Sequence, residues 1–257
     1  MDIYYNLLEK PVFDVKYLLK YYNHEDAARS ALKRLLRSGQ VFKIRNNMYT
    51  CSSGKNGGPV ANRFQIASAV TESSFVSHHS AMEYYGVSDQ VFYEVYVGSM
   101  TQFRSFEFDG YTYRYVSSIF GDGIYNPEFS GGISVTDRER TVIDCIRDMD
   151  HIAGVEEVIS DIQSLKILDE KKLLHYLNLY DSQFLYQKAG YMLQREQKTF
   201  DISDEFLKKC HDKIHKSKRY LTMDHADNVV YDKRWQLVVP ENLYNMKNGI
   251  GIEDANI

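Results

Sequence analysis

The chain has no long apolar run, no secretory signal and only three cysteines among its 257 residues. No stretch approaches the roughly 18 consecutive apolar residues that a membrane-spanning helix requires. The N-terminus, Met1–Asn6, lacks the basic start and apolar run of a signal peptide. Cys51, Cys145 and Cys210 are far apart and show no zinc-ligand spacing, so we expect reduced thiols. These absences predict a soluble cytoplasmic protein that does not enter a membrane.

Motifs for catalysis and cofactor binding are also missing. The sequence contains no Gly-x-Gly-x-x-Gly, no phosphate-binding loop and no Gly-x-Ser-x-Gly elbow. Cys145 lies on the inward face of a predicted helix, which favours a packed thiol over a nucleophile. His211 and His215 stand four residues apart, but no second ligand cluster lies nearby at zinc-site spacing. We expect no enzymatic activity, no cofactor and no metal.

Charge is distributed unevenly along the chain. Although the net charge is −4, residues 1–59 carry ten Lys and Arg against five Asp and Glu. The remaining residues carry 21 basic against 30 acidic side chains. A small basic module on a larger acidic body is typical of a nucleic-acid-binding head. Because 52–59 is rich in Ser and Gly, we predict a flexible linker there and two domains, 1–59 and 60–257.

The first domain has the element order of a winged helix-turn-helix. Helical spacing predicts helices over 3–9, 15–22 and 25–38, the second capped by Asp14 and the third ended by Gly39. Two strands, 40–44 and 48–51, flank the turn formed by Arg45, Asn46 and Asn47. Three helices followed by a two-stranded wing predict DNA binding through the third helix.

The helix over 25–38 has the composition of a recognition helix. Its apolar stripe leaves Arg29, Lys33 and Arg37 together on the opposite face. Because Arg is the most frequent reader of guanine, Arg29 and Arg34 are the candidates for base contacts. Lys33 and Arg37 are the candidates for phosphate contacts. The full predicted DNA-binding set is Arg29, Ser30, Lys33, Arg34 and Arg37 in the helix and Lys43, Arg45, Asn46 and Asn47 in the wing.

The second domain mixes strands and helices and contains no internal repeat. Asp109-Gly110 is the strongest hairpin signal and lies between predicted strands over 103–108 and 111–116. Further strands are predicted over 91–97, 133–135 and 235–240, and helices over 62–71, 79–85, 136–149, 154–165, 170–180, 182–197 and 204–216. The predicted fold class is α+β, with an N-terminal winged helix-turn-helix before a larger mixed α+β domain.

Residues 136–144 carry a motif with a structural interpretation. Thr136 and Glu139 are predicted to form a capping box, and Arg140 can pair with Asp144 one turn later. Capping and pairing account for the motif, so we expect it to support the fold rather than to contact a partner. Its residues are Thr136, Glu139, Arg140, Thr141 and Asp144.

Four short motifs follow one another along nearly the whole chain. They are Gly39–Arg45 with Met48-Tyr49, Ser77–Val87, Val135–Asp144 with its Glu-Arg-Thr core, and Trp235–Asn242. In this order they resemble the AbiEi family of bacterial antitoxins. Asn46-Asn47 replaces the Arg-Gly turn that is common in the wing of that family, and Asn tolerates the left-handed backbone next best after Gly.

The resemblance implies an antitoxin of a phage-defence toxin–antitoxin operon. Such proteins repress their own operon through the winged helix and counter a nucleotidyltransferase-like toxin of the AbiEii type. The implied partners are double-stranded operator DNA and that toxin, which is either bound directly or countered functionally. Two copies on an inverted-repeat operator would associate on the DNA.

Other interpretations stay open. A second basic patch is either a solvated face, a phosphate-contacting surface or a dock for an acidic partner. It consists of Lys208, Lys209, Lys213, Lys216, Lys218 and Arg219. Glu196 and Lys198, preceded by Asp181, faintly resemble a metal-dependent nuclease site. A stand-alone transcription factor whose second domain binds a small molecule and a pure protein-interaction module are further alternatives.

Overall fold

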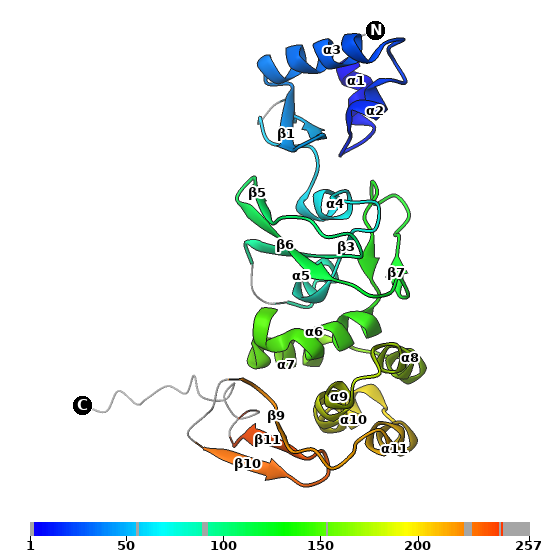
Figure 1. Cartoon of the computed structure of the whole chain (residues 1–257), viewed down its shortest axis with the longest axis vertical. Helices are drawn as coiled ribbons and strands as arrows, with labels where there is room; N and C mark the ends of the chain where they lie inside the picture. Colours follow the sequence, from blue (N-terminus) through cyan, green and yellow to red (C-terminus); the bar gives the residue numbers. More distant parts are fainter. Residues whose placement is uncertain are drawn as a thin grey trace, which may run out of the picture. The chain divides into compact units, whose positions relative to one another are not determined.

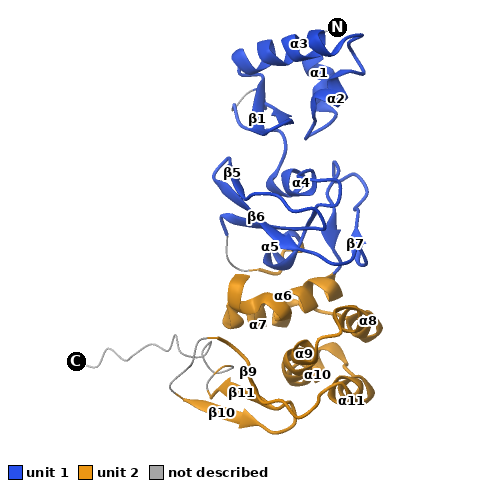
Figure 2. Cartoon of the chain, viewed as in Figure 1, with its two compact units in different colours: residues 1–84, 90–137 blue, residues 85–89, 138–257 orange. Residues whose placement is uncertain are grey.

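The computed structural model describes residues 3–54, 57–88, 92–152, 154–223, 228–241 and Leu243. Its fold is α+β, as the sequence predicts. The chain divides into two compact units, which Figure 2 shows in different colours. Unit 1 comprises residues 1–84 and 90–137, and unit 2 comprises residues 85–89 and 138–257. None of the described helices combines the length and the apolar character needed to cross a membrane.

Unit 1 begins with three helices and a hairpin, which we call the N-terminal module (Figure 1). Its elements are α1 (Ile3–Leu8), α2 (Val15–Leu18), α3 (Glu25–Arg37), β1 (Val41–Arg45) and β2 (Met48–Cys51). The Asp14 carboxylate caps α2 by accepting a hydrogen bond from the Tyr17 amide at 2.9 Å. Gly39 follows the end of α3 with a positive φ, and Asn47 makes the left-handed turn between the strands. The winged helix-turn-helix order is therefore present.

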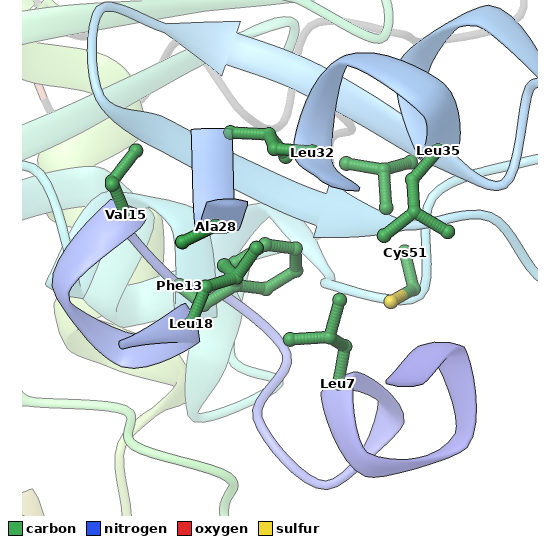
Figure 3. Packing of buried hydrophobic residues seen from close by; sticks show 9 residues of the cluster. Leu7, Phe13, Val15, Leu18, Ala28, Leu32, Leu35 and Cys51 are labelled. Carbon is green, nitrogen blue, oxygen red and sulfur yellow. The ribbon is translucent and has the colours of Figure 1, made fainter. Parts of the chain in front are cut away.

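Side chains from all three helices and both strands build the core of this module (Figure 3). The buried members are Leu7, Phe13, Val15, Leu18, Ala28, Leu32, Leu35, Val41 and Cys51. Leu7 and Leu18 have no exposed surface, and burying one such side chain stabilises a fold by about 1.5–3 kcal/mol. Since α3 contributes one face to this core, its other face is left to solvent.

The segment predicted as a flexible linker folds back on itself. Ser52 pairs with Pro59 in a β-bridge, the Ser53 amide donates to the Gly58 carbonyl at 2.6 Å, and the Val60 amide donates to the Cys51 carbonyl at 2.9 Å. Among the described residues, these bonds close a loop at the end of the hairpin. Lys55 and Asn56 lie outside the described part of the chain. Residue 59 falls inside unit 1, and the chain passes between the two units after residues 84, 89 and 137.

A six-stranded sheet follows in unit 1, in the order β5-β6-β4-β3-β8-β7. Its strands are β3 (Phe75–Val76), β4 (Glu94–Ser99), β5 (Phe106–Phe108), β6 (Tyr111–Ser117), β7 (Ile124–Tyr125) and β8 (Val135–Thr136), with helices α4 (Arg63–Ser68) and α5 (His78–Tyr84). The predicted Asp109-Gly110 hairpin is confirmed, since both residues have positive φ and β5 pairs antiparallel with β6. Gly98 is required by packing, because a Cβ there would overlap the Phe75 ring.

Unit 2 combines helices with a small sheet in the order β10-β11-β9 (Figure 1). Its elements are α6 (Arg138–Ile152), α7 (Val155–Ser164), α8 (Glu170–Tyr180), α9 (Gln183–Arg195), α10 (Gln197–Phe200), α11 (Asp204–Asp212), β9 (Arg219–Tyr220), β10 (Val229–Asp232) and β11 (Leu237–Pro240). Trp235 is buried against Gly190, where any Cβ would overlap the indole ring. The indole Nε1 donates to Gln194 Oε1 at 2.6 Å, which fixes the sheet on α9.

Several boundaries differ from those predicted. The strand expected over 91–97 is β4, and Val91 lies outside the described residues. The helix expected to run to residue 216 ends at Asp212. Thr136 belongs to β8, and α6 begins at Arg138 with Glu139 in its first turn. The Glu139 carboxylate accepts a hydrogen bond from the Asp169 amide at 3.0 Å and lies 3.6 Å from Lys172 Nζ.

Candidate nucleic-acid interface

Helix α3 is divided cleanly into a buried and an exposed face. Its apolar stripe consists of Ala28, Ala31, Leu32 and Leu35, none more than 6% exposed. All five of its predicted DNA-binding residues are exposed, namely Arg29, Ser30, Lys33, Arg34 and Arg37. Because the core holds the helix by the stripe, the long cationic side chains extend from a fixed backbone. This is the arrangement that a helix in a major groove requires.

Few carboxylates oppose these cations. Arg29 Nε donates to Glu25 Oε1 at 2.7 Å, and both side chains of that pair are more than half exposed. Among the described residues, no carboxylate lies within ion-pairing distance of Lys33, Arg34 or Arg37. Exposed ion pairs such as Arg29–Glu25 contribute little to stability and exchange readily for another anion. The face of α3 is therefore a cationic surface available to phosphate.

Two further lysines of the module, Lys16 and Lys20, are exposed and were not among the predicted site residues. Lys20 Nζ lies 4.7 Å from the centre of the Tyr17 ring. The helix before a recognition helix commonly crosses the DNA backbone, so lysines at this position suit phosphate contacts. The sequence signal for these two lysines was their four-residue spacing, with Lys16 on α2 and Lys20 just after its end.

The wing residues do not behave alike. Lys43, Asn46 and Asn47 are exposed, and Asn47 Oδ1 also accepts a hydrogen bond from the Val15 amide at 3.2 Å. Arg45 instead turns inward: its guanidinium carbon lies 5.0 Å from the Phe106 ring centre and 5.6 Å from that of Phe103. The pairing register shifts between Lys43 and Arg45, and such a bulge re-aims the following side chain.

Arg45 therefore stands apart from the other predicted DNA contacts. Its Nη1 is buried and finds no hydrogen-bond partner among the described residues. Phe106, one of the rings beneath it, stacks in parallel on Tyr113 at 4.7 Å. The guanidinium covers an aromatic stack of the six-stranded sheet, so Arg45 joins the wing to the rest of unit 1.

The second basic patch is also exposed, but its cations have more partners. All six predicted members, Lys208, Lys209, Lys213, Lys216, Lys218 and Arg219, are exposed. Lys209 Nζ lies 2.7 Å from Glu205, and Lys213 Nζ lies 3.8 Å from Asp181. Lys218 Nζ lies 5.4 Å from the centre of the Tyr231 ring. The patch differs from α3 in being partly neutralised and in bordering aromatic side chains.

The motif over 136–144 lies in the interior. Thr136, Arg140 and Thr141 have no exposed surface, and Asp144 is 2% exposed. The predicted pair is confirmed, with Arg140 Nε 3.4 Å from Asp144 Oδ2. The Tyr180 hydroxyl donates to Asp144 Oδ1 at 2.5 Å. Burial to this extent agrees with the structural role expected from the sequence.

The residues considered for catalysis or metal binding either have structural roles or do not lie on a shared helix face. Glu196 Oε1 accepts a hydrogen bond from Gln163 Nε2 at 2.8 Å. Asp181 is the left-handed residue that ends α8. His215 lies beyond the end of α11, so it does not share a helix face with His211. Burial raises the pKa of the Cys210 thiol to about 12 and raises the pKa of Cys145 as well, which keeps both thiols protonated.

A cavity of about 280 Å³ in unit 1 is lined partly by Arg63, Tyr111 and Tyr113. The Tyr113 hydroxyl is buried and finds no hydrogen-bond partner among the described residues. Burial raises its pKa, so it remains a hydrogen-bond donor. Arg63 lies 3.2 Å from Glu83, which neutralises much of its charge.

No family model and no curated protein matches the chain. Among solved structures, the chain is similar to the crystal structure of the Rv2827c protein from Mycobacterium tuberculosis, with a TM-score of 0.64 and 14% sequence identity. The match covers 97% of this chain and 93% of that chain. At this identity the similarity is one of fold alone, and it extends over nearly the whole length of the chain.

Proposed function

We propose that the protein binds double-stranded DNA through α3 and the β1–β2 hairpin and regulates transcription in the bacterial cytoplasm. The observation that carries this proposal is the exposed cationic face of α3 opposite a buried apolar stripe. Arg29 and Arg34 read base edges in the major groove, while Lys33 and Arg37 neutralise phosphates. Lys43, Asn46 and Asn47 of the wing contact the backbone or the minor groove.

The operon that it regulates is inferred from the motif resemblance. AbiEi-type antitoxins repress their own toxin–antitoxin operon, and we propose the same autoregulation for this chain. Its partner would then be a nucleotidyltransferase-like toxin of the AbiEii type, and its own role would be binding rather than catalysis. A nucleotidyltransferase-like gene directly beside this one separates the antitoxin from a stand-alone transcription factor.

A titration with the upstream DNA of the gene, followed by fluorescence anisotropy, tests the DNA-binding proposal. We expect specific binding that weakens steeply between about 50 and 200 mM salt, because phosphate contacts release counterions. The Arg29→Ala/Arg34→Ala variant should lose about 30-fold or more in affinity, since each bidentate Arg–guanine contact contributes roughly 1–3 kcal/mol. Neither side chain is in the core, so the variant should fold normally.

The matched control is Arg104→Ala/Lys166→Ala, which removes the same charge from exposed positions outside the N-terminal module. Its affinity should stay within about threefold of the wild type, because neither side chain belongs to α3 or to the β1–β2 hairpin. Equal losses in both double variants would mean that net charge, and not α3, governs binding. Absence of binding at low salt would refute the proposal.

A ligand-responsive regulator is the second candidate. The buried Tyr113 hydroxyl without a partner among the described residues favours it, because such a donor gains a hydrogen bond when a ligand or water enters the adjoining cavity. Phe106 connects this ring to Arg45 of the wing. Operator affinity that responds to a small molecule, and loses that response in Tyr113→Phe, would favour this function over the antitoxin.

A further inference from the structure

The cavity beside Tyr113 is built by two segments of unit 1 that are distant in the sequence. One segment leads from the β1–β2 hairpin into α4, and the other is the turn between β5 and β6 with the first residues of β6. The volume of about 280 Å³ lies just below the range of about 300–1,000 Å³ that is usual for drug-sized ligands. A metabolite of the size of an amino acid therefore fits this cavity. Part of its wall is apolar and consists of Pro59, Val60, Ala61 and Ile66.

The Tyr113 hydroxyl supplies a hydrogen-bond donor that lacks an acceptor. Tyr113 lines the cavity and has no exposed surface. Its buried hydroxyl finds no partner among the residues that the structure describes. Leaving a buried hydroxyl without a partner is unfavourable, and burial also raises the pKa of Tyr113, so that the group keeps its proton. An oxygen atom of a ligand would accept this hydrogen bond.

Arg63 is held in a fixed position at the same cavity. Its guanidinium carbon lies 4.8 Å from the centre of the Phe64 ring and 5.1 Å from that of the Tyr111 ring. A hydrogen bond from Nη2 to Glu83 Oε1 at 3.2 Å uses one of its N–H donors. Within the described ranges, no other acceptor receives a hydrogen bond from this group. The remaining N–H donors of Arg63 are therefore available to a carboxylate of a ligand.

Asp109 adds a charge of the opposite sign. It lines the cavity, and among the described residues no cation lies within ion-pairing distance of it. Burial is the main cause of the raised pKa of Tyr113, but the charge of Asp109 raises this pKa further and that of Arg63 lowers it. Both charges therefore lie near the Tyr113 hydroxyl, since exposed charges farther away than about 10 Å are largely screened. One small cavity thus combines a carboxylate, a guanidinium and an unsatisfied hydroxyl with an apolar wall.

We propose that this cavity binds a free α-amino acid with a small apolar side chain. Its carboxylate accepts hydrogen bonds from the Tyr113 hydroxyl and from Arg63, and its ammonium group donates to Asp109. The side chain of the amino acid packs on the apolar wall of the cavity. Such an amino acid would be the ligand of the ligand-responsive regulator, so the proposal rests on that second candidate function and not on toxin binding.

Both charged groups of the ligand are needed to match the cavity. A carboxylic acid without an ammonium group would leave Asp109 without a cation and near a second anion, which repels it. An amine without a carboxylate would leave the Tyr113 hydroxyl and Arg63 without an acceptor. A charged or amide side chain would lie against the apolar wall without a partner, which is unfavourable. A zwitterion with an apolar side chain avoids all three mismatches.

Isothermal titration calorimetry of the full chain with three probes, in the absence of DNA, tests the proposal. The probes are L-valine, L-valinamide, which lacks the carboxylate, and N-acetyl-L-valine, which lacks the ammonium group. We expect L-valine to bind at least about tenfold more tightly than either of the others, because each of them loses a charge-assisted hydrogen bond. Equal affinity for L-valine and N-acetyl-L-valine would overturn the proposal. So would the absence of L-valine binding at about 10 mM, which exceeds the usual range of metabolite affinities.

Tyr113→Phe separates ligand binding from a structural role. It removes only a hydroxyl that has no acceptor within the described part of the chain, so the melting temperature should stay equal or rise. The affinity for L-valine should fall by about tenfold, because the carboxylate loses a hydrogen bond. A lower melting temperature with unchanged affinity would mean that the hydroxyl supports the fold, and this result would overturn the proposal.

Asp109→Asn removes the carboxylate and keeps the turn, since Asn also tolerates the positive φ of this residue. It should lower the affinity for L-valine by about tenfold and abolish the preference for L-valine over N-acetyl-L-valine. Glu107→Gln is the matched control, because it removes one negative charge from an exposed residue of β5 that does not line the cavity. This control should leave the affinity unchanged. Equal losses in both variants would overturn the pairing of the ammonium group with Asp109.

The Arg29→Ala/Arg34→Ala variant separates this site from DNA binding. Neither residue lines the cavity, so the variant should bind L-valine as the wild type does. Loss of L-valine binding in this variant would overturn the location of the site. Because operator DNA is absent from these titrations, a failure of L-valine to bind would leave the proposal of DNA binding by α3 untouched.

Discussion

Helices α3 and α6 hold arginines in opposite environments. The Arg29 side chain of α3 is 57% exposed, and its partner Glu25 is similarly exposed. Arg140 of α6 is fully buried, and its partner Asp144 is nearly so. Both pairs have the same four-residue spacing, with the acidic residue first in α3 and the arginine first in α6. Their surroundings differ because α3 is a surface helix of a small module, whereas residues on most sides of α6 are buried.

The difference in burial determines the role of each arginine. An exposed pair on a helix contributes about 0.3–0.5 kcal/mol, which a phosphate group easily replaces. A buried charge that loses its partner costs several kcal/mol, because the remaining charge is left in a medium of low dielectric. Arg29 is therefore free to change partners, and Arg140 is not. Exposure rather than residue type identifies the arginines that are available to DNA.

Substitution of the buried Arg140 should have the largest effect, and that effect is on stability. Arg140→Met leaves Asp144 buried without its cation, and we expect a loss of about 3–5 kcal/mol in the free energy of unfolding. Urea unfolding followed by Trp235 fluorescence measures it, since that residue is 1% exposed in unit 2. DNA affinity below the transition should be unchanged. Arg29→Ala should have the reverse pattern, with normal stability and weaker DNA binding.

The double variant Arg140→Met/Asp144→Leu is the control for an uncompensated charge. It removes both charges, and buried pairs replaced by apolar groups of similar volume often recover stability. We expect it to regain at least half of the loss seen in Arg140→Met. If Arg140→Met were as stable as the wild type, the interior role of the motif over 136–144 would be wrong.

The exposure of Arg45 is intermediate between that of Arg29 and that of Arg140. Its guanidinium rests on Phe103 and Phe106, and its Nη1 is buried. We expect Arg45→Gln to lower stability by about 1 kcal/mol through the lost cation–π contact and packing, and to change DNA affinity by less than about threefold. Thermal unfolding and anisotropy measure the two effects.

Arg45→Lys is the matched variant, because it keeps the charge but not the planar group that stacks on the rings. It should resemble Arg45→Gln in stability. A large loss of DNA affinity in Arg45→Gln with unchanged stability would contradict the inward orientation. Such a result would support the DNA contact that the sequence predicts for Arg45 in the wing.

Features that depend on nearby residues were predictable from the sequence. The α8 boundaries, Glu170 and Tyr180, were predicted to the residue, and α3 ends one residue earlier than expected. Asp14 caps α2, and Asp109-Gly110 makes the hairpin. Each of these depends on side-chain spacing, a cap or a turn within a few residues. The exposed face of α3 follows from the same helical periodicity.

Features that depend on distant pairing were not predictable. Strands β3, β7 and β9 are two residues long, and partners from elsewhere in the chain define them. The loop after β2 looked flexible because Gly and Ser are abundant, but backbone bonds across it close it. The inward turn of Arg45 depends on a bulge and on two rings, Phe103 and Phe106, that are 58 and 61 residues away in the sequence. No local pattern encodes these contacts.

The smallest expected effect concerns Lys33. In its proposed role as a phosphate contact it carries no sequence information, so Lys33→Ala should weaken operator and unrelated DNA alike by a few-fold, with a salt slope smaller by about one. Stability should change by less than about 0.5 kcal/mol, because the side chain is exposed. Lys166→Ala, equally exposed, is the control and should leave the slope unchanged. Selective loss on the operator would instead make Lys33 a base contact, and the division of roles between Lys33 and Arg34 would then have to be reversed.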